Sequence, residues 1–417
     1  MYSVALAGIQ KFVRAVTARH PTYGAFYAMI PSRINSSIRL WKTQLPDVSP
    51  FYAVKCNPAP IFLNYLYDQG IHFDCASERE LLQIQSLARA NLPNRVIYAN
   101  PCKSGRDLGA AAAVGSPITV VDSPEEVEKL AEQGYKGGAL IRLAVDDTGS
   151  DMPFSTKFGA PLTMVEAIAG LAYKRGIPLH GFSFHVGSGC KDGHAYQKAI
   201  KASAALIPSL HLTGHPATQI DIGGGFLPNE NDFRSKALHI RSAIQTVQQL
   251  SKVPIQFIAE PGRFFAADSF DFFVEVIGKK MGSNGWMYTL DDSIYGQFSN
   301  ILFDQAKPVW SRVALEPRTR RTLSKGVLFG RTCDSLDVIA RSNSMEELEV
   351  GDWLRFPRMG AYTRATASEF NGFPTPEVFC LEPHECTRYE EGDSEDTQIS
   401  LKYVRHPNSV SVKTLMA

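Results

Sequence analysis

Four motifs in the sequence place a reactive side chain directly after a run of apolar residues. In the first, residues 50–58 read PFYAVKCNP, and Lys55 is the only charged residue among them. We expect Lys55 to be desolvated, which lowers the pKa of a lysine and leaves an amine able to form a Schiff base. A lysine that only extends to the rim of the fold would give the same pattern, so this motif alone leaves both interpretations open.

The other three motifs supply groups that bind anions or hold a proton. Residues 221–226 read DIGGGF. Consecutive glycines allow backbone N–H groups to approach a phosphate closely, although they also form simple tight turns. Glu260 ends an apolar run and is followed by Arg263, whose guanidinium can bind a phosphate. The stretch SFHVGSG contains the imidazole of His185 and the hydroxyl of Ser188.

Together the four motifs contain the groups that pyridoxal 5′-phosphate (PLP) requires: a Schiff-base lysine, a glycine-rich phosphate loop, a phosphate-binding arginine and a carboxylate. Each motif is weak by itself, but their joint occurrence at the ends of successive apolar runs predicts this cofactor. No metal site is predicted. The seven cysteines are odd in number and widely spaced without a CxxC pair, which argues against a zinc cluster and a disulfide framework.

The elements that position these groups follow from the alternation of short apolar runs with helical patterns, which is typical of a parallel sheet with helical crossovers. Eight such runs predict a closed (β/α)8 TIM barrel over residues 34–268, whose reactive groups would lie at the C-terminal ends of its strands. The runs are Phe51–Lys55, Ile71–Cys75, Arg95–Asn100, Ile118–Asp122, Ala139–Val145, Gly181–Val186, Gln219–Ile222 and Ile255–Glu260, with helical patterns at Glu78–Arg89, Pro124–Gln133, Thr163–Arg175 and Asp232–Leu250.

Beyond residue 268 the pattern changes to strand-like runs separated by Gly and Pro. It predicts a mostly β domain, a barrel or sandwich, made of residues 269–417 and completed by residues 1–33. We expect a helix around Val4–Val16 and a strand at Phe26–Ile30. The first 46 residues lack Asp and Glu, as a mitochondrial transit peptide does, but the next motifs follow so soon that we favour a structural helix. The predicted strands are Phe272–Ile277, Trp286–Leu290, Val309–Ala314, Gly326–Phe329 and Asp352–Phe356, and the acidic segment Glu382–Thr397 is predicted to be an exposed loop.

Composition excludes several classes of protein. The chain is 44% hydrophobic and 20% charged, which excludes a mainly disordered protein. With 43 basic against 42 acidic residues, nothing favours nucleic acid or an anionic membrane as a partner. We therefore expect a cytoplasmic enzyme that acts on a small molecule.

These motifs resemble those of the barrel-fold (alanine racemase-type) PLP-dependent basic amino acid decarboxylases, most closely the ornithine decarboxylase-like members. The matching stretches follow the family order from residue 50 to residue 373: PFYAVKCNP, FDCAS, VIYANPCK, FHVGSGC, DIGGGF, EPGRFF, YGQFSNILFD, GRTCDSLD, VGDWLRFPRMGAYT and FNGF.

The resemblance implies a role for each matching residue. Lys55 would hold PLP as a Schiff base, and Glu260 would keep the pyridine nitrogen protonated. His185 would stack on the ring, and Asp74 would lie near the ring and Lys55. The phosphate would be bound by Ser188, Gly223, Gly224, Gly225, Arg263 and Tyr362.

Further roles fall in the second domain. Asp304 and Asp334 would hold the distal ammonium of an amino acid substrate, and Tyr295 and Phe370 would line the same pocket. Cys333 would protonate the carbon left after CO2 departs. In this family Cys333 and Asp334 reach the site from the partner subunit, which implies a head-to-tail homodimer with shared active sites.

The residue types agree with decarboxylation. A protonated pyridinium is a strong electron sink for the carbanion that decarboxylation leaves, and a carboxylate at Glu260 keeps that nitrogen charged. Racemases of the same fold place an arginine there. Two carboxylates at the distal end suit a diamine-type substrate, since a buried ammonium needs compensating charge. The predicted reaction is L-ornithine to putrescine and CO2.

The sequence departs from the family at three places. Pro153 stands where the family has an arginine, Gln305 stands where it has a histidine, and the tail beyond Phe373 has no match. Two alternatives remain: a decarboxylase of lysine, arginine or another amino acid, and a catalytically inactive, inhibitor-like homologue.

Overall fold

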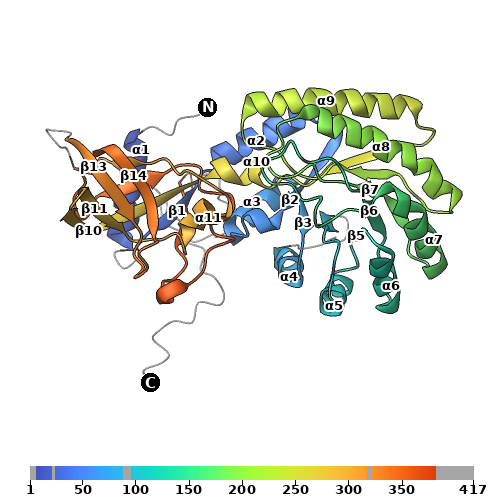
Figure 1. The fold of residues 1–417 in the computed structure, drawn as a ribbon, viewed down its shortest axis with the longest axis horizontal. Helices are drawn as coiled ribbons and strands as arrows, with labels where there is room; N and C mark the ends of the chain where they lie inside the picture. The colour runs from blue at the N-terminus through green and yellow to red at the C-terminus, as the bar shows by residue number, and fades with distance from the viewer. Residues whose placement is uncertain (1–5, 21–23, 88–94, 317–321, 382–417) are drawn as a thin grey trace, which may run out of the picture. The chain divides into compact units, whose positions relative to one another are not determined.

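The computed structural model describes residues 6–20, 24–87, 95–316 and 322–381 (Figure 1). The chain divides into two compact units. The first, residues 35–267, is called the barrel unit below, and the second, residues 1–34 with 268–417, is called the β unit. The segment Glu382–Thr397 and the rest of the tail beyond residue 381 lie outside the described residues.

The barrel unit contains a closed barrel of eight parallel strands in chain order, which confirms the predicted TIM barrel. Each of the eight predicted apolar runs contains or overlaps one strand. The strands are β2 (Val48–Ala53), β3 (His72–Cys75), β4 (Val96–Tyr98), β5 (Ile118–Val121), β6 (Ala139–Arg142), β7 (Leu179–Ser183), β8 (Gln219–Asp221) and β9 (Gln256–Ala259).

Helices follow the strands around the outside of the barrel (Figure 1). Their first turns are encoded locally: the Ser104 hydroxyl accepts from the N–H of Asp107 in a capping box, and Ser123 and Asn229 cap two further helices. The helices are α2 (Pro31–Gln44), α3 (Pro60–Asp68), α4 (Glu78–Leu87), α5 (Gly105–Ala113), α6 (Pro124–Glu132), α7 (Val165–Arg175), α8 (Gly193–Leu212), α9 (Glu230–Leu250) and α10 (Arg263–Ala266).

The β unit is built on a sheet in the order β12-β15-β10-β11-β13-β14, with β1 pairing β10 and β16. Strand β1 comes from the N-terminal segment, as predicted, and runs antiparallel to β10 and parallel to β16. The bounds are α1 (Leu6–Arg19), β1 (Phe26–Met29), β10 (Phe270–Gly282), β11 (Gly285–Leu290), α11 (Asn300–Phe303), β12 (Ser311–Val313), β13 (Leu323–Phe329), β14 (Val338–Glu346), β15 (Trp353–Phe356) and β16 (Glu377–Cys380).

The core of the β unit lies between helix α1 and this sheet. Phe12 and Val13 of α1 pack with Phe26, Phe273 and Trp353, and all five side chains are buried. Burying such side chains is the main favourable contribution to folding, about 1.5–3 kcal/mol for each large apolar group. The N-terminal helix is therefore part of the folded unit.

Two further findings concern the described part of the chain. The six cysteines within it form no disulfide with one another, and Cys386 lies outside it. No helix in that part combines the length and the apolar character needed to cross a bilayer.

Candidate active site

The barrel interior ends in a polar layer at the carboxyl ends of its strands. One layer deeper, an apolar cluster is formed by Phe51, Ile97, Val120, Leu140 and Ile258. Side chains alternate across a strand, so the residues two positions further along face the same interior, closer to the mouth. Strand pairing extends this layer, because Ala53 pairs with Asp74, and Ser183 pairs with both Arg142 and Asp221. The polar layer consists of Asp74, Arg142, Ser183, Asp221 and Glu260.

Lys55 lies just beyond β2. The strand ends at Ala53, and residues 54–56 form a short 3-10 turn. Nζ of Lys55 lies 2.9 Å from Oδ2 of Asp74. The expectation of a desolvated lysine is wrong for this structure, since the Lys55 side chain is 45% exposed while that of Asp74 is fully buried. The turn places the amine at the open end of the barrel, where it is accessible to water and donates a hydrogen bond to Asp74.

Two carboxyl groups of this layer each have an oxygen without a hydrogen-bond donor, and a third, Glu260, shares their desolvated surroundings. Oδ1 of Asp74 and Oδ2 of Asp221 have no hydrogen-bond partner among the described residues. Burial raises the pKa of Asp221 to about 7, and burial together with the charge of Asp221 raises the pKa of Glu260 well above its ordinary value. A cluster of this kind is completed by a cationic N–H donor. The protonated ring nitrogen of PLP is such a donor, so these residues fit the predicted cofactor.

His185 is a neutral imidazole held against the glycine loop. Burial lowers its pKa well below the ordinary value, and the charges of Arg142 and Lys55 act in the same direction. Its Nδ1 accepts a hydrogen bond from the N–H of Gly187 at 3.0 Å. A ring nitrogen that accepts carries no proton, so the proton of the neutral ring is on Nε2. A Cβ at Gly224 would lie 2.8 Å from Nε2, which places the ring directly beside the loop.

The loop at residues 223–225 contains two N–H groups available to an anion. The N–H of Gly223 donates to Oδ1 of Asp221 at 2.8 Å and is therefore already engaged. No described residue accepts a hydrogen bond from the N–H of Gly224 or of Gly225. The hydroxyl of Tyr196 donates to the carbonyl of Gly224 at 2.7 Å and fixes the peptide. Two adjacent free N–H groups fit the oxygens of a phosphate.

Two other predicted phosphate ligands of the same unit follow strands β9 and β7. Arg263 is the first residue of α10 and directly follows Gly262. Ser188 lies between two glycines of positive φ, and its backbone exchanges hydrogen bonds of 3.0 and 3.1 Å with Met152. This bridge joins the loop after β7 to the segment that contains Pro153, so the departure from the family lies next to the predicted phosphate site.

Substituting Gly223 with alanine tests the loop. Gly223 has a φ of +66°, and a Cβ there would lie 2.2 Å from the carbonyl oxygen of Phe184. We expect Gly223→Ala to weaken PLP binding at least about tenfold, because backbone strain of roughly 1–3 kcal/mol would displace the loop. A fluorescence titration with PLP measures this. Gly109→Ala, where nothing lies within 4 Å of the added Cβ, is the control. Wild-type affinity in Gly223→Ala would contradict the assignment.

Three predicted substrate residues come together within the β unit. The hydroxyl of Tyr295 donates to Oδ2 of Asp334, and the rings of Tyr295 and Phe370 lie 4.5 Å apart. Oδ1 of Asp334 accepts from the N–H of Leu336 at 2.9 Å. Both hydrogen bonds lower the pKa of Asp334, and the one from Leu336 contributes more than the one from Tyr295. Asp334 is therefore a carboxylate that can face a substrate ammonium.

The remaining predicted residues of the β unit are Cys333, Asp304 and Tyr362. Cys333 is exposed, and its N–H donates to Oδ1 of Asn371 at 3.4 Å. Asp304 directly follows α11, and its N–H donates to the carbonyl of Asn300 at 3.0 Å. Tyr362 has a φ of +52°, unusual for a residue other than glycine, and its carbonyl accepts from the hydroxyl of Thr366 at 2.8 Å.

The sequence predictions missed three residues of the polar layer, Ser183, Arg142 and Asp221, of which the last two are charged. Asp221 was noted only as part of the DIGGGF motif, yet it binds the Gly223 N–H and shares the surroundings of Glu260. Arg142 is a charged residue in an otherwise apolar strand, and its charge acts on both His185 and Asp221. Arg142 lies two residues after Leu140, which faces the barrel interior on the same strand. Asp221 shares this inward face, because it pairs with Ser183, which pairs with Arg142. The inward-facing position of each residue was the signal that could have identified it.

Comparison with known proteins shows which families and proteins this chain resembles. Residues 31–267 match the family model described as the pyridoxal binding domain of pyridoxal-dependent decarboxylases. The chain is 37% identical to the chloroplastic ornithine decarboxylase of Nicotiana glauca over 85% of this chain and 82% of that protein. It is also 35% identical to antizyme inhibitor 2 of Xenopus laevis, over 90% of this chain and 84% of that one.

Solved structures agree with the fold of the chain. The arginine decarboxylase of Paramecium bursaria Chlorella virus, bound to agmatine, is 32% identical with a TM-score of 0.82, covering 88% of this chain and 99% of its own. The lysine/ornithine decarboxylase of Vibrio vulnificus, complexed with putrescine, is 30% identical with a TM-score of 0.78, covering 89% and 97%.

Proposed function

Since the chain belongs to the pyridoxal-dependent decarboxylases and has PLP as its cofactor, we propose that it is an active enzyme that decarboxylates a basic L-amino acid, with L-ornithine as the preferred substrate and putrescine and CO2 as products. The observation that carries this proposal is the carboxyl cluster at the barrel mouth, where Glu260 lies in the same desolvated surroundings as Asp221. This is the setting that keeps a ring nitrogen protonated, as decarboxylation requires.

When bound, PLP supplies an electron sink for the electrons left behind as CO2 departs. Lys55 provides the amine that attaches the cofactor, and its ion pair with Asp74 at 2.9 Å orients that amine. Glu260 would accept a hydrogen bond from the protonated ring nitrogen and so keep it charged, and Asp221 holds the loop that follows β8 by accepting from the N–H of Gly223. The N–H groups of Gly224 and Gly225, with Arg263 and Ser188, would bind the phosphate.

The β unit supplies the residues proposed for the substrate. Asp334 is held as a carboxylate by Leu336 and Tyr295, which suits a distal ammonium. Asp304 is the second carboxylate of this end. Cys333 is exposed and carries a proton that can be delivered to carbon after CO2 leaves. The head-to-tail homodimer that would bring these residues to a partner's barrel, and the cytoplasmic location, stay predictions.

Ornithine is favoured over arginine and lysine because curated ornithine decarboxylases match over most of their length. The solved relatives include arginine and lysine/ornithine decarboxylases, so the substrate is tested directly. Purified protein with PLP is incubated with L-ornithine, L-lysine and L-arginine, and the amines and CO2 are quantified. We expect kcat/KM for ornithine to exceed that for lysine and arginine by at least about tenfold, the scale of one methylene or one polar contact. Preference for lysine or arginine would overturn the assignment.

A second candidate function is that of an inactive regulatory homologue. It is favoured by the match to antizyme inhibitor 2 and by Pro153 in place of the family arginine. The same panel decides between the two. Turnover of any basic amino acid excludes it, whereas a protein that takes up no PLP and releases no CO2 would establish it.

A further inference from the structure

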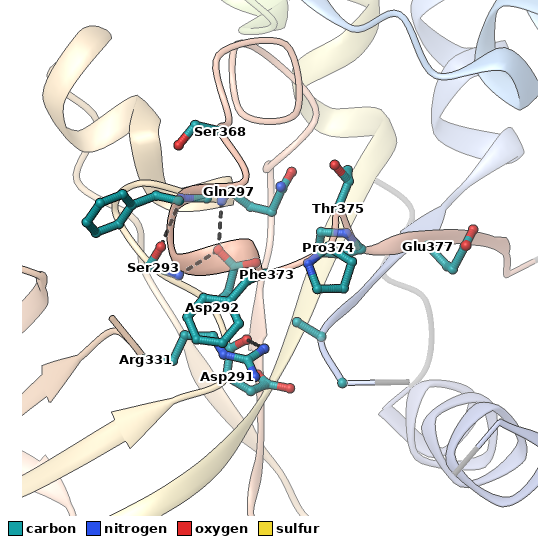
Figure 2. Close-up of a pocket in the computed structure, with 15 residues that line it drawn as sticks. Asp291, Asp292, Ser293, Gln297, Arg331, Ser368, Phe373, Pro374, Thr375 and Glu377 are labelled. Carbon is teal, nitrogen blue, oxygen red and sulfur yellow. Dashed lines mark hydrogen bonds between the residues drawn. The ribbon is translucent and has the colours of Figure 1, made fainter. Parts of the chain in front are cut away.

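The β unit contains a cavity of about 140 Å³ whose polar lining is held by the backbone (Figure 2). Asp292 accepts hydrogen bonds from the N–H groups of Ser293 and Gln297, both at 2.7 Å. Nη1 of Arg331 donates to the carbonyl of Asp291 at 2.9 Å. The Arg331 bond joins the segment after β11 to the segment after β13, so this lining has a structural role within the β unit.

At the mouth of the barrel unit, an aromatic ring contacts a residue proposed for the cofactor. The centres of the rings of Phe154 and His185 lie 5.0 Å apart, and their planes are inclined by 62° in an edge-to-face arrangement. His185 follows β7 by two residues, whereas Phe154 belongs to residues 147–155, called the mouth segment below, which follow β6. The contact therefore joins two segments that leave neighbouring strands of the barrel.

A buried carboxylate holds the mouth segment from within. Asp147 is 2% exposed, and it accepts hydrogen bonds from the N–H of Phe154, from the N–H of Ser155 at 2.8 Å and from the Ser155 hydroxyl. Burial acts to raise the pKa of Asp147, but the hydrogen bonds from Ser155 and Phe154 outweigh it and the pKa is lowered. Asp147 is therefore charged at neutral pH, and the bonds that it accepts are of the stronger, charge-assisted kind.

The mouth segment is also attached to the loop after β7. The backbones of Met152 and Ser188 exchange hydrogen bonds of 3.0 and 3.1 Å. Pro153 follows Met152, and its ring fixes its own φ, which removes one rotatable bond directly before Phe154. The backbone of Phe154 is thus constrained on both sides, and its side chain has a defined direction.

The imidazole of His185 is held by two different contacts. The N–H of Gly187 donates to Nδ1 at 3.0 Å and fixes one edge of the ring. A ring that is held at one edge can still tilt about it, and a second ring in van der Waals contact limits that tilt. Phe154 supplies this second contact.

We propose that Phe154 is a positioning residue for His185. The mouth segment, anchored by Asp147, keeps the ring of Phe154 against the imidazole, and this contact sets the plane in which the imidazole meets the cofactor ring. The inference rests on the proposed role of His185 beside the cofactor. Phe154 acts through His185 alone. An aliphatic side chain cannot form an edge-to-face contact, so the aromatic ring is the feature that matters.

Phe154→Leu tests this role, because it removes the ring and keeps an apolar side chain at a half-buried position. In a fluorescence titration we expect PLP to bind roughly two- to tenfold more weakly, the scale of one aromatic pair. The visible circular dichroism of the bound cofactor should change, since the imidazole no longer holds one orientation. Phe154→Tyr retains the ring and should restore both affinity and spectrum.

The matched control is Tyr173→Leu, which removes an aromatic ring 6.1 Å from another imidazole of the same unit, that of His215. We expect it to match the wild type in affinity and spectrum. Wild-type affinity and circular dichroism in Phe154→Leu would overturn the proposal. Tighter binding of PLP would overturn it as well, because the ring of Phe154 would then compete with the cofactor.

The anchoring role of Asp147 is tested by combining substitutions. Asp147→Ala should reproduce the weaker PLP binding of Phe154→Leu, and the double variant should bind no more weakly than the weaker single variant, since both changes act through one contact. Losses that add in the double variant would contradict this role, because Asp147 would then act independently of Phe154.

A measurement on the cofactor-free protein separates this proposal from the proposed function. Burial lowers the pKa of His185, and the charges of Arg142 and Lys55 act in the same direction. Phe154→Leu leaves both cations in place and admits water, so a histidine-selective NMR titration should show the pKa of His185 rising toward its ordinary value, without a change in Tyr173→Leu. An unchanged pKa would overturn the positioning role even in an active decarboxylase. Wild-type protein that binds no PLP would overturn the proposed function, while the rise in pKa would still support the contact.

Discussion

Replacing Lys55 with alanine is expected to lower the rate of decarboxylation by roughly 10⁴-fold or more and to abolish covalent attachment of the cofactor. Lys55 is the lysine that the turn after β2 delivers to the barrel mouth, 2.9 Å from Asp74. Without its amine the cofactor has no attachment point, and losses of this size follow removal of a covalent catalyst. The rate is measured as CO2 release, and borohydride treatment followed by peptide mass spectrometry locates the pyridoxyl group.

The control for this experiment is Lys191→Ala. Lys191 belongs to the same unit, but it is 71% exposed and pairs with Asp151 on the surface. It should retain wild-type rate and pyridoxyl labelling at residue 55. Label on another lysine of the wild-type protein would sink both the residue assignment and the proposed mechanism.

Replacing Glu260 with glutamine has the second largest expected effect. The amide has no negative charge to stabilise a protonated ring nitrogen, so that nitrogen would lose its proton and the electron sink would weaken. We expect kcat to fall roughly 10²- to 10³-fold, the scale of one preorganised electrostatic group, while the cofactor still binds. Rapid-quench or steady-state kinetics with a parallel absorbance spectrum would show this. Unchanged kcat with bound cofactor would remove Glu260 from the site.

The same carboxyl cluster predicts a pH dependence for the cofactor-free protein. The pKa of Asp221 is raised from 3.8 to about 7 in the folded state. The stability that this group contributes is therefore fully present below about pH 4 and is lost as pH rises to about 7. The Tm is expected to fall across this range, and Asp221→Asn should flatten the fall. Differential scanning fluorimetry with and without PLP tests it, since a cationic ring nitrogen would offset the loss.

The barrel was predictable because its strands are short, continuous and apolar, and each is followed by a helical pattern. The ends of the strands were less predictable. Lys55 extends the apolar run in the sequence, but the backbone leaves the strand at Ala53, and this two-residue difference exposes the side chain. The exposure of the Lys55 side chain depends on the direction of the turn at residues 54–56, and no local sequence pattern encodes that direction.

Other features depended on tertiary pairing. Strand β14 contains the polar stretch RSNSM, so it lacks the alternation that signals a strand and forms by pairing with β13. The hydrogen bond of Tyr295 to Asp334 joins residues 39 positions apart, and no local sequence pattern encodes it. The barrel residues predicted to bind PLP, by contrast, share one end of the barrel because each follows one of its parallel strands.

Strand β1 lies between β10 and β16, and its register joins Phe26 to Glu377. The barrel sequence is thus an insertion inside the β unit. During synthesis on the ribosome, all eight barrel strands emerge before β10 and β16, the two strands that pair with β1. The barrel can therefore close while the apolar side chains of helix α1 and β1 are still exposed. A nascent chain that has completed the barrel but not yet β10 leaves helix α1 and β1 without any of their strand partners, and it is the form in which we expect the apolar side chains of α1 and β1 to be most exposed.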